Sequence, residues 1–133
     1  MNCTKNLQTL NLYGNMLEGP IPNGFGKVMN SLESFSASRN KLQGKIPSFF
    51  GNMCRLQALY LSNNKSNKIS HFFQNSSLCN RHIFQNLDLS YNQIIGKIPK
   101  NITMLSELES LYLDENSLEG DVTESHLFNL LLL

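Results

Sequence analysis

Four tyrosines are the side chains of this sequence best suited to binding chemistry. Each offers a rigid apolar ring and a polar hydroxyl group at a low cost in side-chain entropy. All four fall where apolar and polar residues alternate, so we expect them on the polar face of short strands. A binding role explains this placement, and so does the high strand propensity of tyrosine, so both interpretations stay open. The four are Tyr13, Tyr60, Tyr91 and Tyr112.

Polar and charged residues accompany the tyrosines on the same predicted face. Near the C-terminal end they are mostly acidic, because Asp88, Asp114 and Glu115 fall with Tyr112 in the last two repeats. Such a face would take a protein or peptide ligand, and its acidic end suits a basic partner. The candidate ligand-binding residues are Asn11, Tyr13, Arg39, Tyr60, Asp88, Tyr91, Tyr112 and Asp114.

Catalytic and metal-binding chemistry find no support in the sequence. The three histidines, His71, His82 and His126, have no recurring partner, and the sequence contains no nucleophile elbow. A zinc site from Cys54, His71, Cys79 and His82 is conceivable by residue type, but its spacing matches no zinc finger. We therefore expect a protein that is not an enzyme and that holds no metal or cofactor.

The cysteines bear on the compartment in which the protein folds. Cys54 and Cys79 each precede a predicted strand, one repeat apart, so they are candidates for a disulfide in an oxidising compartment. Cys3 would then be left without a partner in this sequence.

Asparagines in Asn-X-Ser/Thr sequons are candidates for glycosylation. Asn75 and Asn101 fall on predicted return segments, where a glycan could be accommodated. A third sequon begins at Asn2, and a fourth at Asn64, which we expect to be too buried for modification.

These candidate residues are positioned by a repeat that recurs five times along the chain. Each copy follows the pattern LxxLxLxxN, with other apolar residues replacing some leucines, as at Phe35 and Ala37. The steps between closing asparagines are 25, 24, 28 and 24 residues, which is the period of a leucine-rich repeat. The closing asparagines are Asn15, Asn40, Asn64, Asn92 and Asn116.

The repeat predicts a stacked architecture in which each copy forms one turn of a spiral, here called a coil. Alternating leucines describe a short strand with one buried face. A buried asparagine needs partners for its carbonyl oxygen and its amide group, which backbone groups of neighbouring coils can supply. We therefore expect an α/β solenoid, a right-handed superhelix of mostly strand and irregular structure with little α-helix. Its parallel concave sheet would face a convex side of short 3₁₀ turns or extended segments.

The sequence predicts a single domain over residues 1–133, with about five repeats and no cap at either end. After its asparagine, the first coil should return Phe25 and Val28 to the core. The predicted repeats span residues 6–31, 32–55, 56–83, 84–107 and 108–130.

The third coil departs most from the pattern. It carries Ser66 and Lys68 where its neighbours have leucine or isoleucine and glycine, and its step is the longest. We expect an irregular, partly looped return from Ser66 to Arg81. Its predicted apolar anchors are Ile69, Phe72 or Phe73, and Leu78.

Composition and the chain ends limit the partners. The net charge is +1 and only 16% of residues are charged, so charge gives no argument for nucleic acid or an anionic membrane surface. No apolar tract is long enough to span a bilayer, and the N-terminus lacks the apolar centre of a signal peptide. Both ends interrupt the repeat, which favours a segment of a longer protein.

The segments that follow the repeat asparagines carry a more specific resemblance. LEGPIP, LQGKIP and IIGKIP, at 17–22, 42–47 and 94–99, resemble the plant-specific extracellular repeat LxxLxxLxLxxNxLxGxIP. That class occurs in receptor-like proteins, receptor-like kinases and polygalacturonase-inhibiting proteins. Longer phrases, such as FGNMCRLQALYLSNNK at 50–65, are similar to ectodomains of legume receptor-like proteins related to receptors for fungal xylanase.

The resemblance implies a ligand-recognition segment of a plant cell-surface receptor-like protein in defence signalling. Its implied partners are a protein or peptide ligand and a co-receptor. A complete member would lie on the extracellular face of the plasma membrane, while this segment makes no direct membrane contact. Two alternatives remain open: a soluble polygalacturonase-inhibitor-like protein that binds a fungal enzyme, and a truncated gene fragment without activity.

Overall fold

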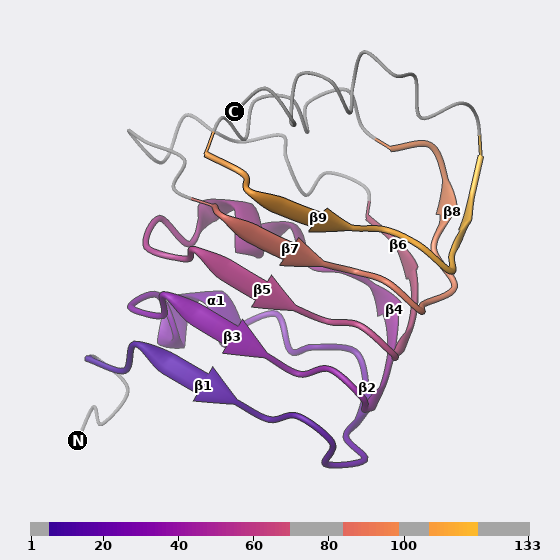
Figure 1. The fold of residues 1–133 in the computed structure, drawn as a ribbon. Helices are drawn as coiled ribbons and strands as arrows, with labels where there is room; N and C mark the ends of the chain where they lie inside the picture. Colours follow the sequence, from indigo (N-terminus) through magenta and orange to yellow (C-terminus); the bar gives the residue numbers. More distant parts are fainter. Residues whose placement is uncertain (1–5, 70–83, 99–106, 120–133) are drawn as a thin grey trace.

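The computed structural model describes residues 6–69, 84–98 and 107–119, which wind into a solenoid (Figure 1). Along one side, five short strands form a sheet in the order β1-β3-β5-β7-β9, and each neighbouring pair is parallel. This is the predicted concave sheet, and the solenoid with little helix is confirmed. Its strands are β1 (Thr9–Asn11), β3 (Ser34–Ser36), β5 (Ala58–Tyr60), β7 (Asn86–Asp88) and β9 (Ser110–Tyr112).

The central residue of each strand explains why the strands stack in one register. Leu10 pairs with Phe35, Phe35 with Leu59, Leu59 with Leu87 and Leu87 with Leu111. Phe35, Leu59 and Leu87 are at most 2% exposed, whereas Leu10 and Leu111 in the outer strands are partly buried. A slip by one residue would turn these side chains outward, so burial fixes the register.

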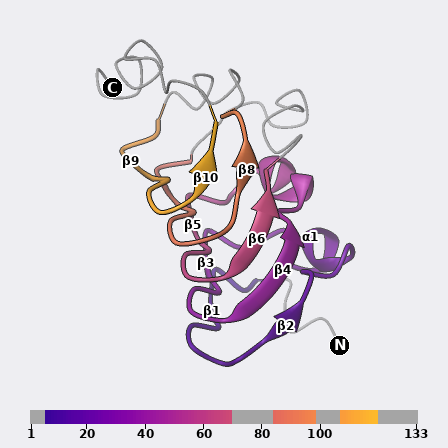
Figure 2. The same ribbon diagram turned by 90° about the vertical axis from the view of Figure 1, so that its right-hand side faces the viewer.

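A second row of strands forms another side of the solenoid, which faces the viewer in Figure 2. It comprises a three-stranded sheet, β2-β4-β6, and a two-stranded sheet, β10-β8, both parallel. The sequence predicts extended segments here but not their pairing; together the two are called the rear sheets below. The strands are β2 (Glu18–Gly19), β4 (Lys41–Lys45), β6 (Lys65–Lys68), β8 (Ile95–Gly96) and β10 (Ser117–Leu118).

The irregular return predicted from Ser66 is wrong for its first residues, because these lie in β6. Backbone pairing with β4 does not depend on the missing leucine, and Ser66 is small enough to be buried in its place. The β4–β6 pairing is irregular near the position where the third coil has Lys68 in place of glycine. In β4, Gly44 occupies that position with a positive φ of 87°, and the register shifts directly after it, so that Lys45 pairs with Lys68. Ile69 is buried as expected, and residues 70–83 lie outside the described part of the chain.

Two short helical turns close the first two coils. They are α1 (Phe25–Val28) and the 3₁₀ turn η1 (Ser48–Asn52). The expectation that Val28 returns to the core is wrong, since Val28 is 55% exposed. The turn of α1 places Phe25 and Met29, four residues apart, on the face that packs against the core, and Val28 faces away.

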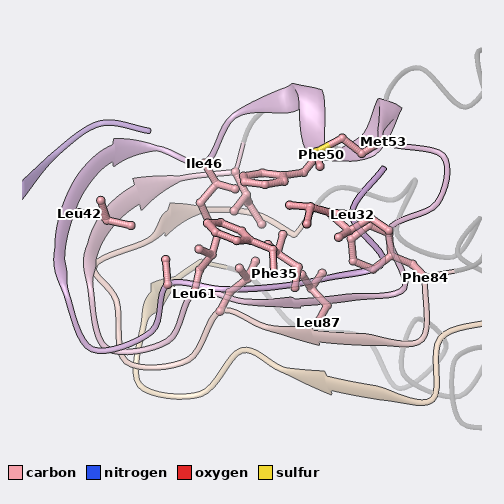
Figure 3. Close-up of a cluster of buried hydrophobic side chains, with 14 of the residues drawn as sticks. Leu32, Phe35, Leu42, Ile46, Phe50, Met53, Leu61, Phe84 and Leu87 are labelled. Atoms are coloured by element: carbon pink, nitrogen blue, oxygen red, sulfur yellow. The ribbon is translucent and has the colours of Figure 1, made fainter. Parts of the chain in front are cut away.

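The core between the sheets is centred on aromatic rings (Figure 3). The ring centroid of Phe35 lies 4.8 Å from that of Phe25 and 5.9 Å from that of Phe50. Ala37 is the next inward residue after Phe35 and is 1% exposed, so a small side chain compensates for the large one. Each well-placed ring pair contributes about 0.5–1.5 kcal/mol beyond its burial.

Asparagine side chains join the coils along the turn that follows each concave strand. The side-chain oxygen of Asn40 accepts the N–H of Leu17 at 2.9 Å, and its amide nitrogen donates to the carbonyl of Leu12 at 2.9 Å. Asn64, Asn92 and Asn116 repeat this arrangement one coil further on each time. Within the described residues, Asn15 differs: its exposed side chain donates only to Tyr13 in its own coil.

Candidate ligand-binding face

An acidic residue lies between two tyrosines on the outer face of the concave sheet. The register pairs Tyr60 with Asp88 and Asp88 with Tyr112, so the three occupy the same position of adjacent strands β5, β7 and β9. Paired residues of neighbouring strands are about 4.8 Å apart. Tyr112 is 54% exposed, while Tyr60 and Asp88 are half-buried. This row, the Tyr-Asp-Tyr row, presents two rings and a carboxylate to solvent.

Hydrogen bonds within its own coil hold the Asp88 carboxylate in place. One carboxylate oxygen, Oδ1, accepts the backbone N–H of Ser90 at 3.0 Å and the Ser90 hydroxyl at 2.6 Å. The other oxygen has no partner among the residues that the structure describes. A carboxylate oriented in this way can accept hydrogen bonds from a ligand without first losing side-chain freedom.

Neighbouring polar residues extend the row toward the starts of the strands. Asn86 and Ser110 pair across β7 and β9, and the Ser110 hydroxyl donates to the side-chain oxygen of Asn86. Both are half-buried. Sequence reasoning did not single out this pair or the juxtaposition of Asp88 with the tyrosines, although aligning the repeats on their asparagines puts Tyr60, Asp88 and Tyr112 in one column.

A second line of residues follows the strands where the chain turns away from the sheet. Arg39, Asn63, Tyr91 and Glu115 each precede a closing asparagine, and each has a positive φ of 54–56°. The guanidinium of Arg39 lies over the ring of Tyr13, with its Cζ atom 5.7 Å from the ring centroid. This is a cation–π contact, which joins two predicted site residues at the opposite end of the face from Tyr112.

Some positions that alternation predicts to face solvent are buried. Ser38, Ser62 and Ser90 each lie two residues after an outward strand residue, so alternation predicts that they face solvent, but all three are at most 9% exposed. Ala58, at the start of β5, is also predicted outward and is 8% exposed. Alternation ends with the three-residue strand, and the chain then turns so that these serines point inward. Ser62 donates from its backbone N–H and its hydroxyl to the Ser38 hydroxyl oxygen, at 3.1 and 3.0 Å.

Charge is unevenly distributed over this face. Asp88, Glu109, Asp114 and Glu115 lie in the fourth and fifth coils, and the last three are exposed. Arg39, in the second coil, is the cation of the predicted site. The arrangement gives the β7–β9 end a negative potential, which suits a positively charged group.

The remaining predicted sites lie largely outside the described residues. Cys54 is disulfide-bonded, and both cysteines that could be its partner, Cys3 and Cys79, fall outside, so pairing with Cys79 stays a prediction. The sequons at Asn75 and Asn101 also fall outside, whereas Asn64 is 7% exposed. Over the described ranges, no group of three His, Cys, Asp or Glu side chains could hold a metal ion.

The repeat pattern matches a family of known proteins. The family model described as Leucine Rich Repeat matches residues 6–28, 31–53 and 84–105, just over half of the sequence. The chain belongs to the leucine-rich repeat family. None of the curated proteins matches the sequence.

Several solved structures are similar to this chain, and one of them is the leucine-rich repeat ectodomain of a plant receptor. The ectodomain of the membrane receptor kinase GASSHO1/SCHENGEN3 from Arabidopsis thaliana, in complex with CASPARIAN STRIP INTEGRITY FACTOR 2, is 32% identical with a TM-score of 0.79. PEPR1 in complex with AtPEP1 is 30% identical with a TM-score of 0.81. The BIR3–SERK2 complex from Arabidopsis thaliana is 32% identical with a TM-score of 0.76.

The matches cover most of this leucine-rich repeat chain but only part of the receptors. They include 94%, 93% and 86% of this chain, and 14%, 17% and 59% of the respective solved chains. In the part of the chain that the structure describes, no helix has the length and apolar character needed to cross a membrane. The chain is therefore similar to a segment of a plant receptor ectodomain.

Proposed function

We propose that this leucine-rich repeat chain is a ligand-recognition segment of a plant cell-surface receptor-like protein, and that its concave sheet binds a peptide with basic side chains. The observation that carries the proposal is the Tyr-Asp-Tyr row, in which a carboxylate fixed by Ser90 lies between two tyrosines. Two flanking rings can pack against the apolar stem of a lysine or arginine while Asp88 accepts its hydrogen bonds.

The similar solved structures support a peptide as the ligand class. The receptor kinase GASSHO1/SCHENGEN3 was solved with CASPARIAN STRIP INTEGRITY FACTOR 2, and PEPR1 with AtPEP1. A further similar structure is described as the plant peptide hormone receptor RGFR1 in complex with RGF2. The complex of BIR3 with SERK2 supports a second protein as a partner, to which we assign the role of a co-receptor. The complete protein would act at the extracellular face of the plasma membrane, as a binding protein and not as an enzyme.

Charge favours a basic ligand over a neutral one. Asp88, Asp114 and Glu115 lie at one end of the face. They belong to two adjacent coils, so they attract the same segment of a ligand. Arg39 over Tyr13 marks the other end, three coils away from Tyr112. A peptide lying across the strands would thus meet opposite charges at its two ends, which would select one orientation.

Selection from a random peptide library tests the ligand class. We expect peptides selected on the full chain to be enriched in lysine and arginine. Asp88→Asn/Asp114→Asn should weaken binding of the selected pool about tenfold, the loss expected for two charge-assisted contacts. The matched control is Glu18→Gln/Glu119→Gln, which removes the same charge from exposed positions at the rear sheets. Selected peptides without basic residues, or equal losses in both variants, would refute the proposal.

The role in defence rests on the sequence resemblance to legume receptor-like proteins related to receptors for fungal xylanase. Disrupting the locus in the source plant should reduce the early oxidative burst that follows treatment with a fungal cell-wall-degrading enzyme. A burst of wild-type size in the disrupted line would exclude defence perception, and the peptide selection would still report on ligand binding.

A further inference from the structure

Five exposed lysines lie in or next to the strands of the rear sheets, which form a different side of the solenoid from the concave sheet (Figure 2). Lys41 and Lys45 lie in β4, Lys65 and Lys68 lie in β6, and Lys97 follows β8; all five are exposed. Together they are called the lysine face. Two acidic residues border this face: Glu18 pairs with Lys41 across β2 and β4, and Glu119 follows β10 and donates its backbone N–H to Gly96, the residue before Lys97. The central lysines, Lys45, Lys65 and Lys68, pair with no acidic residue.

The lysine face brings its charges together through the backbone pairing. Lys45 pairs with Lys68, and Lys65 pairs with Gln43, so the ammonium groups come from strands about 4.8 Å apart. None of the five ammonium groups forms an ion pair or hydrogen bond with another described residue. Like charges at directly paired positions, such as Lys45 and Lys68, repel one another, so an anionic ligand would relieve a cost that the free protein carries.

An open hollow of about 440 Å³ lies within this face. Its polar lining is Lys65 together with three side-chain amides, those of Gln43, Asn67 and Gln93. Each amide both donates and accepts hydrogen bonds, and none is bonded to another described side chain. This donor and acceptor set matches hydroxyl groups, which also do both.

The lining also argues against a protein segment as the occupant. Protein partners are typically anchored by aromatic, arginine or large apolar side chains seated in a pocket. The remaining lining residues are Pro20 and Gly44, which offer little apolar surface. The cations are all lysines, without the planar guanidinium fork that favours bidentate phosphate recognition.

We infer that the lysine face binds an acidic polysaccharide, a linear chain of sugars that carry carboxylates. Its carboxylates would lie against the lysines of successive strands, and its hydroxyl groups would bond the amides of Gln43, Asn67 and Gln93. The repetition of the strands suits a polymer whose charge also repeats. This binding is independent of the proposed peptide site, because it uses a different sheet and a different side of the solenoid.

Polygalacturonate is the probe that tests this inference, with its methyl-esterified form as the neutral control on the same backbone. We expect the full chain to bind the acidic polymer and not the esterified one, with an affinity that falls as salt is added. Lys65→Gln/Lys68→Gln should weaken binding about tenfold. Lys27→Gln/Arg55→Gln removes two exposed cations away from the rear sheets and should leave binding within about twofold.

The outcomes separate the alternatives. Circular dichroism should show the same folded signal for both double variants, so that a loss of binding reports on the surface. Equal binding of the esterified polymer, or equal losses in the two double variants, would overturn the inference. Tighter binding of poly-glutamate or of phosphatidylserine vesicles than of polygalacturonate would also overturn it, by assigning the face to an acidic protein or a membrane.

Discussion

The side-chain oxygen of Asn64 accepts a hydrogen bond of 3.0 Å from the backbone N–H of Leu42, one coil earlier in the solenoid. The Asn64 amide nitrogen donates to the carbonyls of Ala37, in the earlier coil, and of Leu61 and Ser62, in its own. One buried side chain therefore satisfies backbone groups of two coils at the turn where no strand pairing can do so.

Replacing this residue should strongly destabilise the protein. Asn64→Ala leaves the Leu42 N–H and several carbonyls buried without partners, and we expect it to lower the free energy of unfolding by about 3–5 kcal/mol. Urea denaturation followed by circular dichroism measures the change. Asn67→Ala is the control, because its exposed side chain has no bond to a described residue; it should change stability by less than about 0.5 kcal/mol. Similar losses in both variants would contradict the role of Asn64 in joining the coils.

The fold could be predicted because the same physical demand recurs in every coil. Alternating leucines require a half-buried strand, and an asparagine at a fixed place requires stacked backbone partners, as at Asn64. The pairing of the rear sheets could not be predicted, because it depends on backbone hydrogen bonds, which place little demand on the type of side chain. β6 illustrates this: Ser66 and Lys68 break the consensus, yet the strand forms.

The site was less predictable because alternation holds only within the strands. It correctly placed Asp88 and Tyr112 outward, but past the strand end it also placed Ser38 and Ser62 outward, and these are buried. The left-handed backbone at Arg39 and Asn63 redirects the chain there. Asparagine favours that conformation, but arginine, tyrosine and glutamate occupy the equivalent positions of other coils, so the residue types gave no consistent indication. The Asp88 to Ser90 hydrogen bonds also depend on this turn.

The Ser38 and Ser62 pair should show unequal sensitivity to mutation. Ser38→Ala removes the acceptor of the buried Ser62 N–H, so we expect a loss of about 1–3 kcal/mol in the free energy of unfolding. Ser62→Ala removes only one donor to the Ser38 oxygen and should cost about 1 kcal/mol or less. Denaturant unfolding of both single variants and the double variant measures this. Equal single losses that add in the double variant would exclude the shared hydrogen bond.

Gly26 should resist substitution because of its neighbour and not because of its backbone conformation. A Cβ atom at this position would lie 2.9 Å from the Phe49 ring, so Gly26→Ala must displace a ring that packs against Phe25 and Phe50. We expect a loss of about 1–3 kcal/mol in unfolding free energy.

Gly24 provides the matched control for this substitution. It has a φ of −80°, and open space lies where a Cβ atom would be added, so Gly24→Ala should be neutral or stabilise by up to about 1 kcal/mol. Thermal unfolding of the two variants compares them directly. A Gly26→Ala protein as stable as Gly24→Ala would show that the Phe49 ring can move at little cost.

The disulfide of Cys54 should contribute to stability by linking the turn after η1 to another part of the chain. If the partner is Cys79, the bridge closes a loop of about one coil, for which loop-closure entropy predicts roughly 3 kcal/mol. Cys54→Ser and Cys79→Ser should then lower the unfolding free energy equally, while Cys3→Ser should leave it within about 0.5 kcal/mol of the wild type. Mass spectrometry of an unreduced digest should yield a peptide pair joined through Cys54 and Cys79. A pair joined through Cys3, with Cys79→Ser unfolding like the wild type, would assign the bridge to the N-terminal cysteine instead, because only the residues that share the bond lose stability together.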